Sequence, residues 1–184
     1  MVRRITIRSV AVLCAGLVML SAFPSSSQPL DKRTAKGLSV QLGTGIIYGG
    51  NGLMVDYQVP LSGLFRMSPF IGIGGTVGGT DGSESKYYWL GYSAGLNLEL
   101  GKMHRILVSP HFFGSHNVHR NPSTAWINKK TIYGPSLMLG YKGTARFGLV
   151  WQIGVGAVYT PNPLSRSTAY SLNPHLDLGI GYKF

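Results

Sequence analysis

The stretch YSLNPHLDLGIGYKF, residues 170–184, decides the fold of this chain. Its even-numbered positions carry the large apolar and aromatic side chains Tyr170, Leu172, Leu176, Leu178, Ile180, Tyr182 and Phe184. Its odd-numbered positions carry small or polar residues, among them Asn173, His175, Asp177 and Lys183. Strict alternation of this kind indicates a β-strand with one apolar face and one polar face.

Seven earlier segments repeat the period of two, and no window shows a convincing helical period. They are residues 37–48, 52–61, 66–78, 86–100, 104–115, 130–142 and 145–159. With residues 170–184 they make eight strands of about 10–15 residues, whereas strands in soluble proteins average about 5–6. Because a tilted strand needs about 9–11 residues to cross a bilayer, these lengths predict an all-β chain: an eight-stranded antiparallel up-and-down transmembrane β-barrel.

Composition supports a chain that faces lipid through strands. Only 12% of the 184 residues are charged, against about 25% in soluble domains. Mean hydropathy is only +0.12, and no apolar run after residue 20 approaches the roughly 20 residues of a spanning helix. A hydrophobic content of 44% also argues against a disordered chain. These values exclude a helical membrane protein and leave the barrel.

The first residues have the layout of a secretory signal peptide. Arg3, Arg4 and Arg8 precede a short apolar run and then several small residues, which predicts a signal peptide over residues 1–27 with cleavage near 22–27. We expect a flexible periplasmic lead over residues 28–36 and the barrel over 37–184. Removing those three arginines from 17 basic residues leaves 14 against 6 acidic ones, a net charge of +8. That charge favours anionic lipid as a neighbour, because an exported chain seldom meets nucleic acid.

The connections and faces predict an orientation. Residues 61–65, 101–103 and 143–144 are short links, whereas 79–85, 116–129 and 160–169 are longer and polar, so we place the short links and both termini in the periplasm. Aromatic residues gather near strand ends on the apolar face, as at a lipid headgroup boundary, and glycine and polar residues fill the other face, which we assign to the lumen. There Glu99 and Arg105 are expected to pair, with Arg66 or Arg146 nearby. In-strand prolines at 69, 110, 135 and 174 are expected to mark bulges.

Two segments resemble a known group. SPFIGIG, residues 68–74, and LDLGIGYKF, residues 176–184, are similar to strands of small eight-stranded bacterial outer-membrane β-barrels of the OmpA and OmpX type. The resemblance implies a location in the outer membrane of a Gram-negative bacterium. It also implies that Phe184, supported by Tyr182 and Ile180, is the signal read by the outer-membrane assembly machinery.

Catalytic and metal-binding patterns are weak. Ser109 and His111 share one face of a predicted strand, and His175 and Asp177 share that of another, so a Ser/His/acid hydrolase acting on lipid A is conceivable. However, the His-x-Ser-Asn pattern of known lipid A deacylases is absent, and we assign no catalytic residue. His116 and His119 lack an acidic partner, so we expect no metal and no cofactor.

The third outer loop offers the most suggestive surface. His116, His119, Arg120, Lys129 and Lys130 surround Trp126, a combination suited to the phosphates of lipopolysaccharide or to a host glycan. We therefore expect a monomeric, non-enzymatic barrel with a structural or surface-interaction role through its outer loops, in contact with outer-membrane lipids. The alternatives are a lipid A-modifying hydrolase or acyltransferase and a narrow channel for small solutes.

Overall fold

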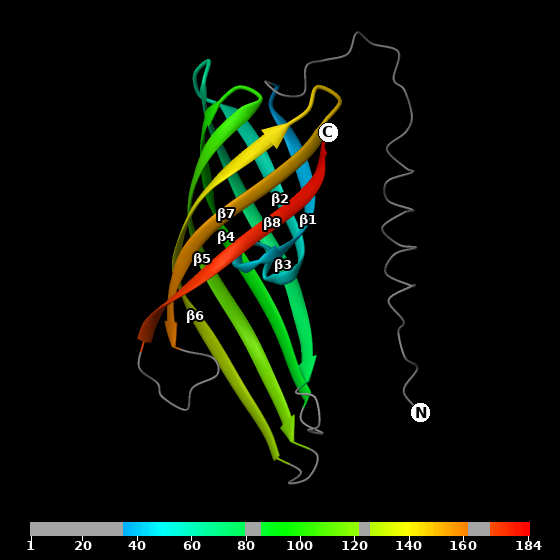
Figure 1. The fold of residues 1–184 in the computed structure, drawn as a ribbon, viewed down its shortest axis with the longest axis vertical. Helices are drawn as coiled ribbons and strands as arrows, with labels where there is room; N and C mark the ends of the chain where they lie inside the picture. The colour runs from blue at the N-terminus through cyan, green and yellow to red at the C-terminus, as the bar shows by residue number, and fades with distance from the viewer. Residues whose placement is uncertain (1–34, 80–85, 122–125, 162–169) are drawn as a thin grey trace. The chain divides into compact units, whose positions relative to one another are not determined.

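The computed structural model describes residues 35–79, 86–121, 126–161 and 170–184. The signal peptide predicted over residues 1–27 and nearly all of the lead predicted over 28–36 therefore lie outside the described residues. The described strands form one closed barrel in the order β1 to β8, each antiparallel to its neighbours along the chain (Figure 1). Ser39 to Thr44 of β1 pair with Lys183 to Leu178 of β8 and close it.

The predicted all-β, eight-stranded, up-and-down barrel is confirmed. Its elements are β1 (Gly37–Gly45), the 3₁₀ turn η1 (Ile46–Tyr48), β2 (Gly50–Pro60), β3 (Phe65–Gly79), β4 (Lys86–Gly101), β5 (His104–Asn121), β6 (Trp126–Thr144), β7 (Leu149–Pro161) and β8 (Tyr170–Lys183). Within these ranges no helix is long and apolar enough to cross a membrane.

The outward wall is apolar and the interior is polar. Large apolar side chains on the wall stay exposed, such as Ile106 at 66% and Leu172 at 69%, whereas the charged side chains of Asp56, Glu99 and Arg105 are buried at 1% or less. Aromatic pairs such as Phe112 with Tyr133 and Tyr159 with Tyr170 lie exposed on this wall. Such a surface is stable only against lipid, because water would face a continuous apolar belt.

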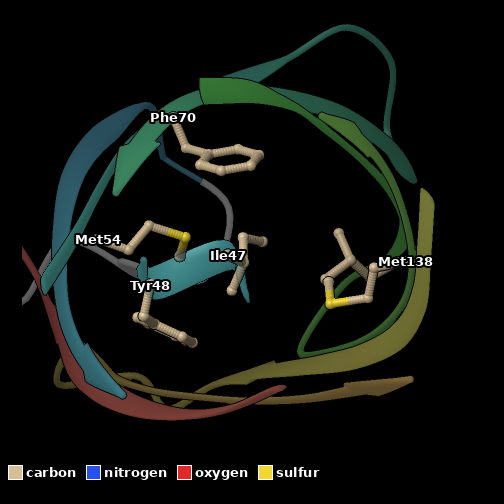
Figure 2. Close-up of a cluster of buried hydrophobic side chains, with 6 residues drawn as sticks. Ile47, Tyr48, Met54, Phe70 and Met138 are labelled. Atoms are coloured by element: carbon tan, nitrogen blue, oxygen red, sulfur yellow. The ribbon is translucent and has the colours of Figure 1, made fainter. Parts of the chain in front are cut away.

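The first predicted strand is wrong beyond residue 45. We expected Ile46 and Tyr48 on the apolar lipid face, but the chain turns inward at Gly45 and η1 lies inside the barrel, with Ile47 and Tyr48 fully buried (Figure 2). Gly45, Gly49 and Gly50 adopt positive φ angles of 115°, 67° and 109°, a backbone region that other residues rarely enter. The turn is thus possible because glycine occupies these three positions.

The predicted third outer loop, residues 116–129, is also wrong. β5 continues to Asn121 and β6 begins at Trp126, and these two residues pair as the last rung of a long hairpin. In Figure 1 this hairpin reaches the bottom of the view, whereas the C-terminus lies near the top. The apolar alternation fades beyond His116 because strands that extend past the membrane no longer need an apolar face.

The in-strand prolines do not mark bulges. The β2–β3 ladder omits the rungs opposite Pro69, and the β4–β5 ladder omits those opposite Pro110, yet the register is the same on both sides of each gap. Pro135 lies just beyond the end of the β6–β7 ladder, and Pro174 lies beyond the end of the β1–β8 ladder. Each proline therefore occupies a place where one neighbouring strand requires no donor.

Candidate functional site

The predicted basic surface lies on the β5–β6 hairpin. His116 is exposed, and its Nδ1 lies 2.9 Å from the Thr131 Oγ1, while Lys130 is partly exposed and pairs in register with Asn117. For the remaining residues the structure describes the backbone position only: His119 opposes Asn128, Arg120 opposes Ile127, Val118 opposes Lys129 and Trp126 opposes Asn121. The six predicted residues are thus brought together on one two-stranded hairpin.

This end of the barrel is rich in basic residues. Lys86 on β4 pairs with Arg120 on β5, one rung from the position of His119. Between Glu99 and Asp177 the sequence contains no Asp or Glu at all, so β5 and β6 carry basic residues without an acidic one. The two strands of the hairpin therefore contribute basic side chains and no acidic one.

A shallow depression lies on the wall beside the hairpin. It is lined by Gly75, Thr76, Tyr88, Trp89, Leu90, His116 and Val118. Tyr88 and Leu90 are about half exposed on the outward wall. The depression joins an apolar surface to the basic hairpin at His116.

The lumen holds a network of buried charges. The Arg105 Nε lies 3.2 Å from the Glu99 Oε2, so the structure brings together the two residues expected to pair. Sequence reasoning missed Lys142, whose Nζ lies 2.8 Å from the Asp56 Oδ2 and 3.0 Å from the Glu99 Oε1. Its inward position was readable from its parity with Met138 and Gly140 on the same strand.

The two arginines expected near this pair differ in position. Arg66 is buried, and its Nη1 donates to the carbonyl oxygen of Gly101 at 2.5 Å. Arg146 is exposed in the turn between β6 and β7, so its expected inward position is wrong. The strand predicted from residue 145 begins only at Leu149, because a turn closed by the Ala145 and Leu149 backbones occupies the intervening residues.

The weak catalytic candidates also meet inside the barrel. The His111 and His175 rings lie 6.1 Å apart between centroids, and the His175 Nδ1 lies 2.5 Å from the Asp177 Oδ2. Ser109 does not supply its hydroxyl to either histidine; only its carbonyl oxygen contacts the His111 Nδ1, at 3.0 Å. The serine that does approach is Ser136, whose Oγ lies 3.1 Å from the His175 Nε2. Sequence reasoning missed it because Ser136 is 39 residues from His175.

The η1 turn fills the lumen next to these residues. The Ile47 amide donates to the Asp177 Oδ1 at 2.9 Å, the Ser93 hydroxyl donates to the Ile47 carbonyl oxygen at 2.5 Å, and the Tyr48 hydroxyl donates to the Gln41 Oε1 at 3.3 Å. Burial, and then the nearby Asp177 and Asp56 carboxylates, raises the pKa of the Tyr48 phenol, so the hydroxyl keeps its proton. In the described residues no three His, Cys, Asp or Glu side chains are grouped as metal ligands.

The residues proposed as an assembly signal lie at the closing seam of the barrel. Ile180 and Tyr182 pair with Leu42 and Val40 of β1, and the Phe184 amide donates to the Leu38 carbonyl oxygen at 2.9 Å. Phe184 is 58% exposed on the outward wall, with its ring 5.2 Å from that of Tyr182. The terminal strand thus closes the barrel and exposes the Phe184 ring on the outward, apolar wall.

Comparison with known proteins identifies the fold. No protein-family model matches the sequence, and no curated protein sequence matches it. Among solved structures, the attachment invasion locus protein Ail of Yersinia pestis aligns with a TM-score of 0.52 at 9% identity, covering 81% of this chain and 97% of Ail. CarO of Acinetobacter baumannii aligns with a TM-score of 0.51 at 12% identity, covering 80% and 97%. With the closed barrel and its apolar wall, these likenesses show that the chain has the fold of the small eight-stranded β-barrels of the bacterial outer membrane.

Proposed function

We propose that this barrel binds lipopolysaccharide at the end that carries the β5–β6 hairpin, through contacts between its basic residues and the phosphates of the lipid. The observation that carries the proposal is the absence of any acidic residue between Glu99 and Asp177, so that the strands of the hairpin carry basic residues and no acidic one. Lysine and arginine form strong charge-assisted hydrogen bonds to phosphate.

The wall next to the hairpin suits the rest of such a lipid. The depression at Gly75 opens on an apolar surface that includes Tyr88 and Leu90, and His116 lies at its border. An amphiphile with a phosphorylated headgroup could thus place an acyl chain along the wall and its phosphates beside the hairpin. This role is one of surface interaction and needs no channel, which agrees with the position of Ile47 and Tyr48 inside the lumen.

The test compares two sets of basic residues at opposite ends of the barrel. One variant changes Arg120, Lys129 and Lys130 to Gln; the control changes Lys102 and Arg146, both exposed in short turns, to Gln. Binding of purified lipopolysaccharide to the barrel in detergent is measured between low and high NaCl. Because each exposed charge pair contributes about 0.2–1 kcal/mol, the hairpin variant should bind about tenfold more weakly.

The wild type and the control should share a salt dependence that the hairpin variant largely loses, because exposed charges are screened over about 10 Å at 0.1 M salt and about 3 Å at 1 M. Equal binding by the hairpin variant and the control, or binding that salt leaves unchanged, would refute a phosphate contact by the hairpin.

A further inference from the structure

Three side chains on the inner side of the wall form a continuous hydrogen-bonded series. The Ser136 Oγ on β6 lies 3.1 Å from the His175 Nε2, and the His175 Nδ1 lies 2.5 Å from the Asp177 Oδ2, both on β8. The other Asp177 oxygen accepts the Ile47 amide at 2.9 Å, which holds the carboxylate in place. A carboxylate that accepts from Nδ1 leaves Nε2 of a neutral imidazole as the acceptor for the serine proton. The arrangement is that of a serine activated by a histidine that a carboxylate orients.

Ser136 stands at the end of a hydrogen-bonded seam. The β6–β7 ladder runs from Thr144 with Val150 to Ser136 with Val158 and stops there. Beyond this rung β6 pairs with β5 only and β7 with β8 only, and Pro135 has no amide hydrogen to offer. The two backbones still touch at Gly134, where an added Cβ would meet the Tyr159 carbonyl oxygen. Beyond Ser136 the strands can therefore part without breaking ladder rungs.

The depth of this seam in the membrane suits lipid ester chemistry. Tyr133 on β6 stacks on Phe112, and Tyr159 on β7 packs against Tyr170, so exposed aromatic residues flank the seam on the outward wall. Bands of aromatic residues mark the boundary between hydrocarbon and headgroups. The acyl ester bonds of membrane lipids lie at that boundary. Ser136 lies on the inner side of the barrel wall at this seam, so only the wall separates it from the lipid.

The interior next to the series contains apolar side chains and a histidine nitrogen without a hydrogen-bond partner in the described part of the chain. Phe113, Ile132 and Val158 are buried at 2–3% exposure; Val158 pairs with Ser136, and Phe113 pairs with Gly134, two residues before Ser136. His111 is 6% exposed, and its Nδ1 contacts the Ser109 carbonyl oxygen, an acceptor, so Nδ1 carries the proton. Its Nε2 is buried without a hydrogen-bond partner among the described residues. A buried acceptor of this kind is suited to a hydroxyl group or water that arrives with a ligand.

From this geometry we propose that Ser136, His175 and Asp177 form an acyl-transfer site that cleaves acyl esters of membrane lipids. The Ser136 oxygen attacks the ester carbonyl carbon, and its proton passes to the His175 Nε2. The carbon–oxygen bond to the alcohol breaks, and His175 returns the proton to the departing alkoxide, which leaves an acyl ester on Ser136.

Water then attacks the acyl ester, with His175 taking the proton and His111 accepting a hydrogen bond from the water. The tetrahedral adduct collapses, the serine oxygen regains its proton, and the fatty acid leaves. At rest the Ser136 hydroxyl also lies 3.1 Å from the Ala157 carbonyl oxygen, so the proton has two acceptors and must turn toward His175 for attack. This activity goes beyond lipid binding and departs from the non-enzymatic role predicted from the sequence.

The first test is covalent labelling by a fluorophosphonate probe, which reacts with activated serines. The full-length barrel, wild type and variants, is folded in detergent, and folding is checked by its heat-modifiable gel mobility. We expect one labelled residue, Ser136, identified by peptide mass spectrometry. Ser136→Ala should abolish the label, and His175→Ala should slow labelling about 100-fold or more, the contribution of a general base. The control Ser115→Ala removes another buried inward serine and should label within about twofold of wild type.

The second test identifies the ester. Vesicles of glycerophospholipid and vesicles that contain lipid A are each incubated with the folded barrel, and released fatty acid is measured by mass spectrometry. Release from either lipid that disappears in Ser136→Ala supports the site and names its source. A folded wild type that shows no label above Ser136→Ala overturns the proposal. A label at Ser136 without fatty acid from either lipid overturns the assignment of lipid esters as substrate.

Discussion

Replacing Lys142 with Met removes the cation that joins two buried carboxylates. The Lys142 ammonium lies 2.8 Å from an Asp56 oxygen and 3.0 Å from a Glu99 oxygen, and all three side chains are fully buried. At an effective dielectric constant of about 20, each contact is worth about 5–6 kcal/mol before the cost of desolvation. Methionine keeps most of the volume of lysine, so the substitution isolates the charge rather than the packing.

The structure indicates which carboxylate loses more of its stabilising contacts when Lys142 is replaced. Without Lys142, Glu99 keeps the Arg105 guanidinium at 3.2 Å and the Ser68 hydroxyl at 3.0 Å, whereas Asp56 keeps only the Gln41 amide at 3.0 Å. Breaking a buried pair by removing one partner costs about 3–5 kcal/mol. We therefore expect Lys142→Met to lower the free energy of unfolding by about 4 kcal/mol, roughly a thousandfold in the unfolding equilibrium.

The assay is urea unfolding of the barrel in lipid vesicles, followed by tryptophan fluorescence and heat-modifiable gel mobility. The control Lys102→Met changes an exposed lysine in the β4–β5 turn and should cost less than about 0.5 kcal/mol. Adding Asp56→Asn to Lys142→Met should restore about 1–2 kcal/mol, because the amide needs no counter-charge. The reasoning fails if Lys142→Met is no less stable than the control, or if the losses of the two single variants simply add.

Three further predictions concern the closing strand, the buried turn and the electrostatics of Glu99. Deleting Phe184 should reduce the yield in the outer membrane and increase periplasmic degradation, measured by fractionation and immunoblotting; an unchanged yield would argue against its role as an assembly signal. Gly179→Ala should cost about 1–3 kcal/mol because its methyl group would overlap the Tyr48 ring and hydroxyl, whereas Gly63→Ala, with open space around it, should be nearly neutral; equal unfolding midpoints would contradict this packing. Glu99→Ala should destabilise the barrel, and Glu99→Ala with Arg105→Ala should recover part of the loss in the same urea assay; strict additivity would remove the pairing.

The alternation of side chains predicted most of the barrel. Side chains along a strand alternate with a strict period of two, so the sequence of a single segment such as 170–184 shows which residues share a face, without reference to the rest of the chain. The inward position of Asp56, Glu99 and Asp177 could be read in the same way. The number of strands and their antiparallel order followed from the count of segments and the length of the links between them.

Where the alternation stops carrying information, the sequence prediction was wrong. Beyond the membrane a strand needs no apolar face, so the paired hairpin between His116 and Lys129 had the composition of a loop. The η1 turn shows the opposite case, because Ile46 and Tyr48 continue the apolar pattern of β1 although the backbone has already turned inward. The glycines at 43 and 179, on different strands, leave the space that Tyr48 fills, and no local pattern contains that information.

The sequence by itself determined which residues within the regular strands face the lumen, and only the tertiary structure decided which of them meet. Lys142 reaches Asp56 across 86 positions of the chain, and Ser136 reaches His175 across 39. Parity along a strand depends on the local geometry of the backbone, so the sequence contains it. Contacts across the lumen depend on closure and on the register between strands, which are properties of the whole barrel.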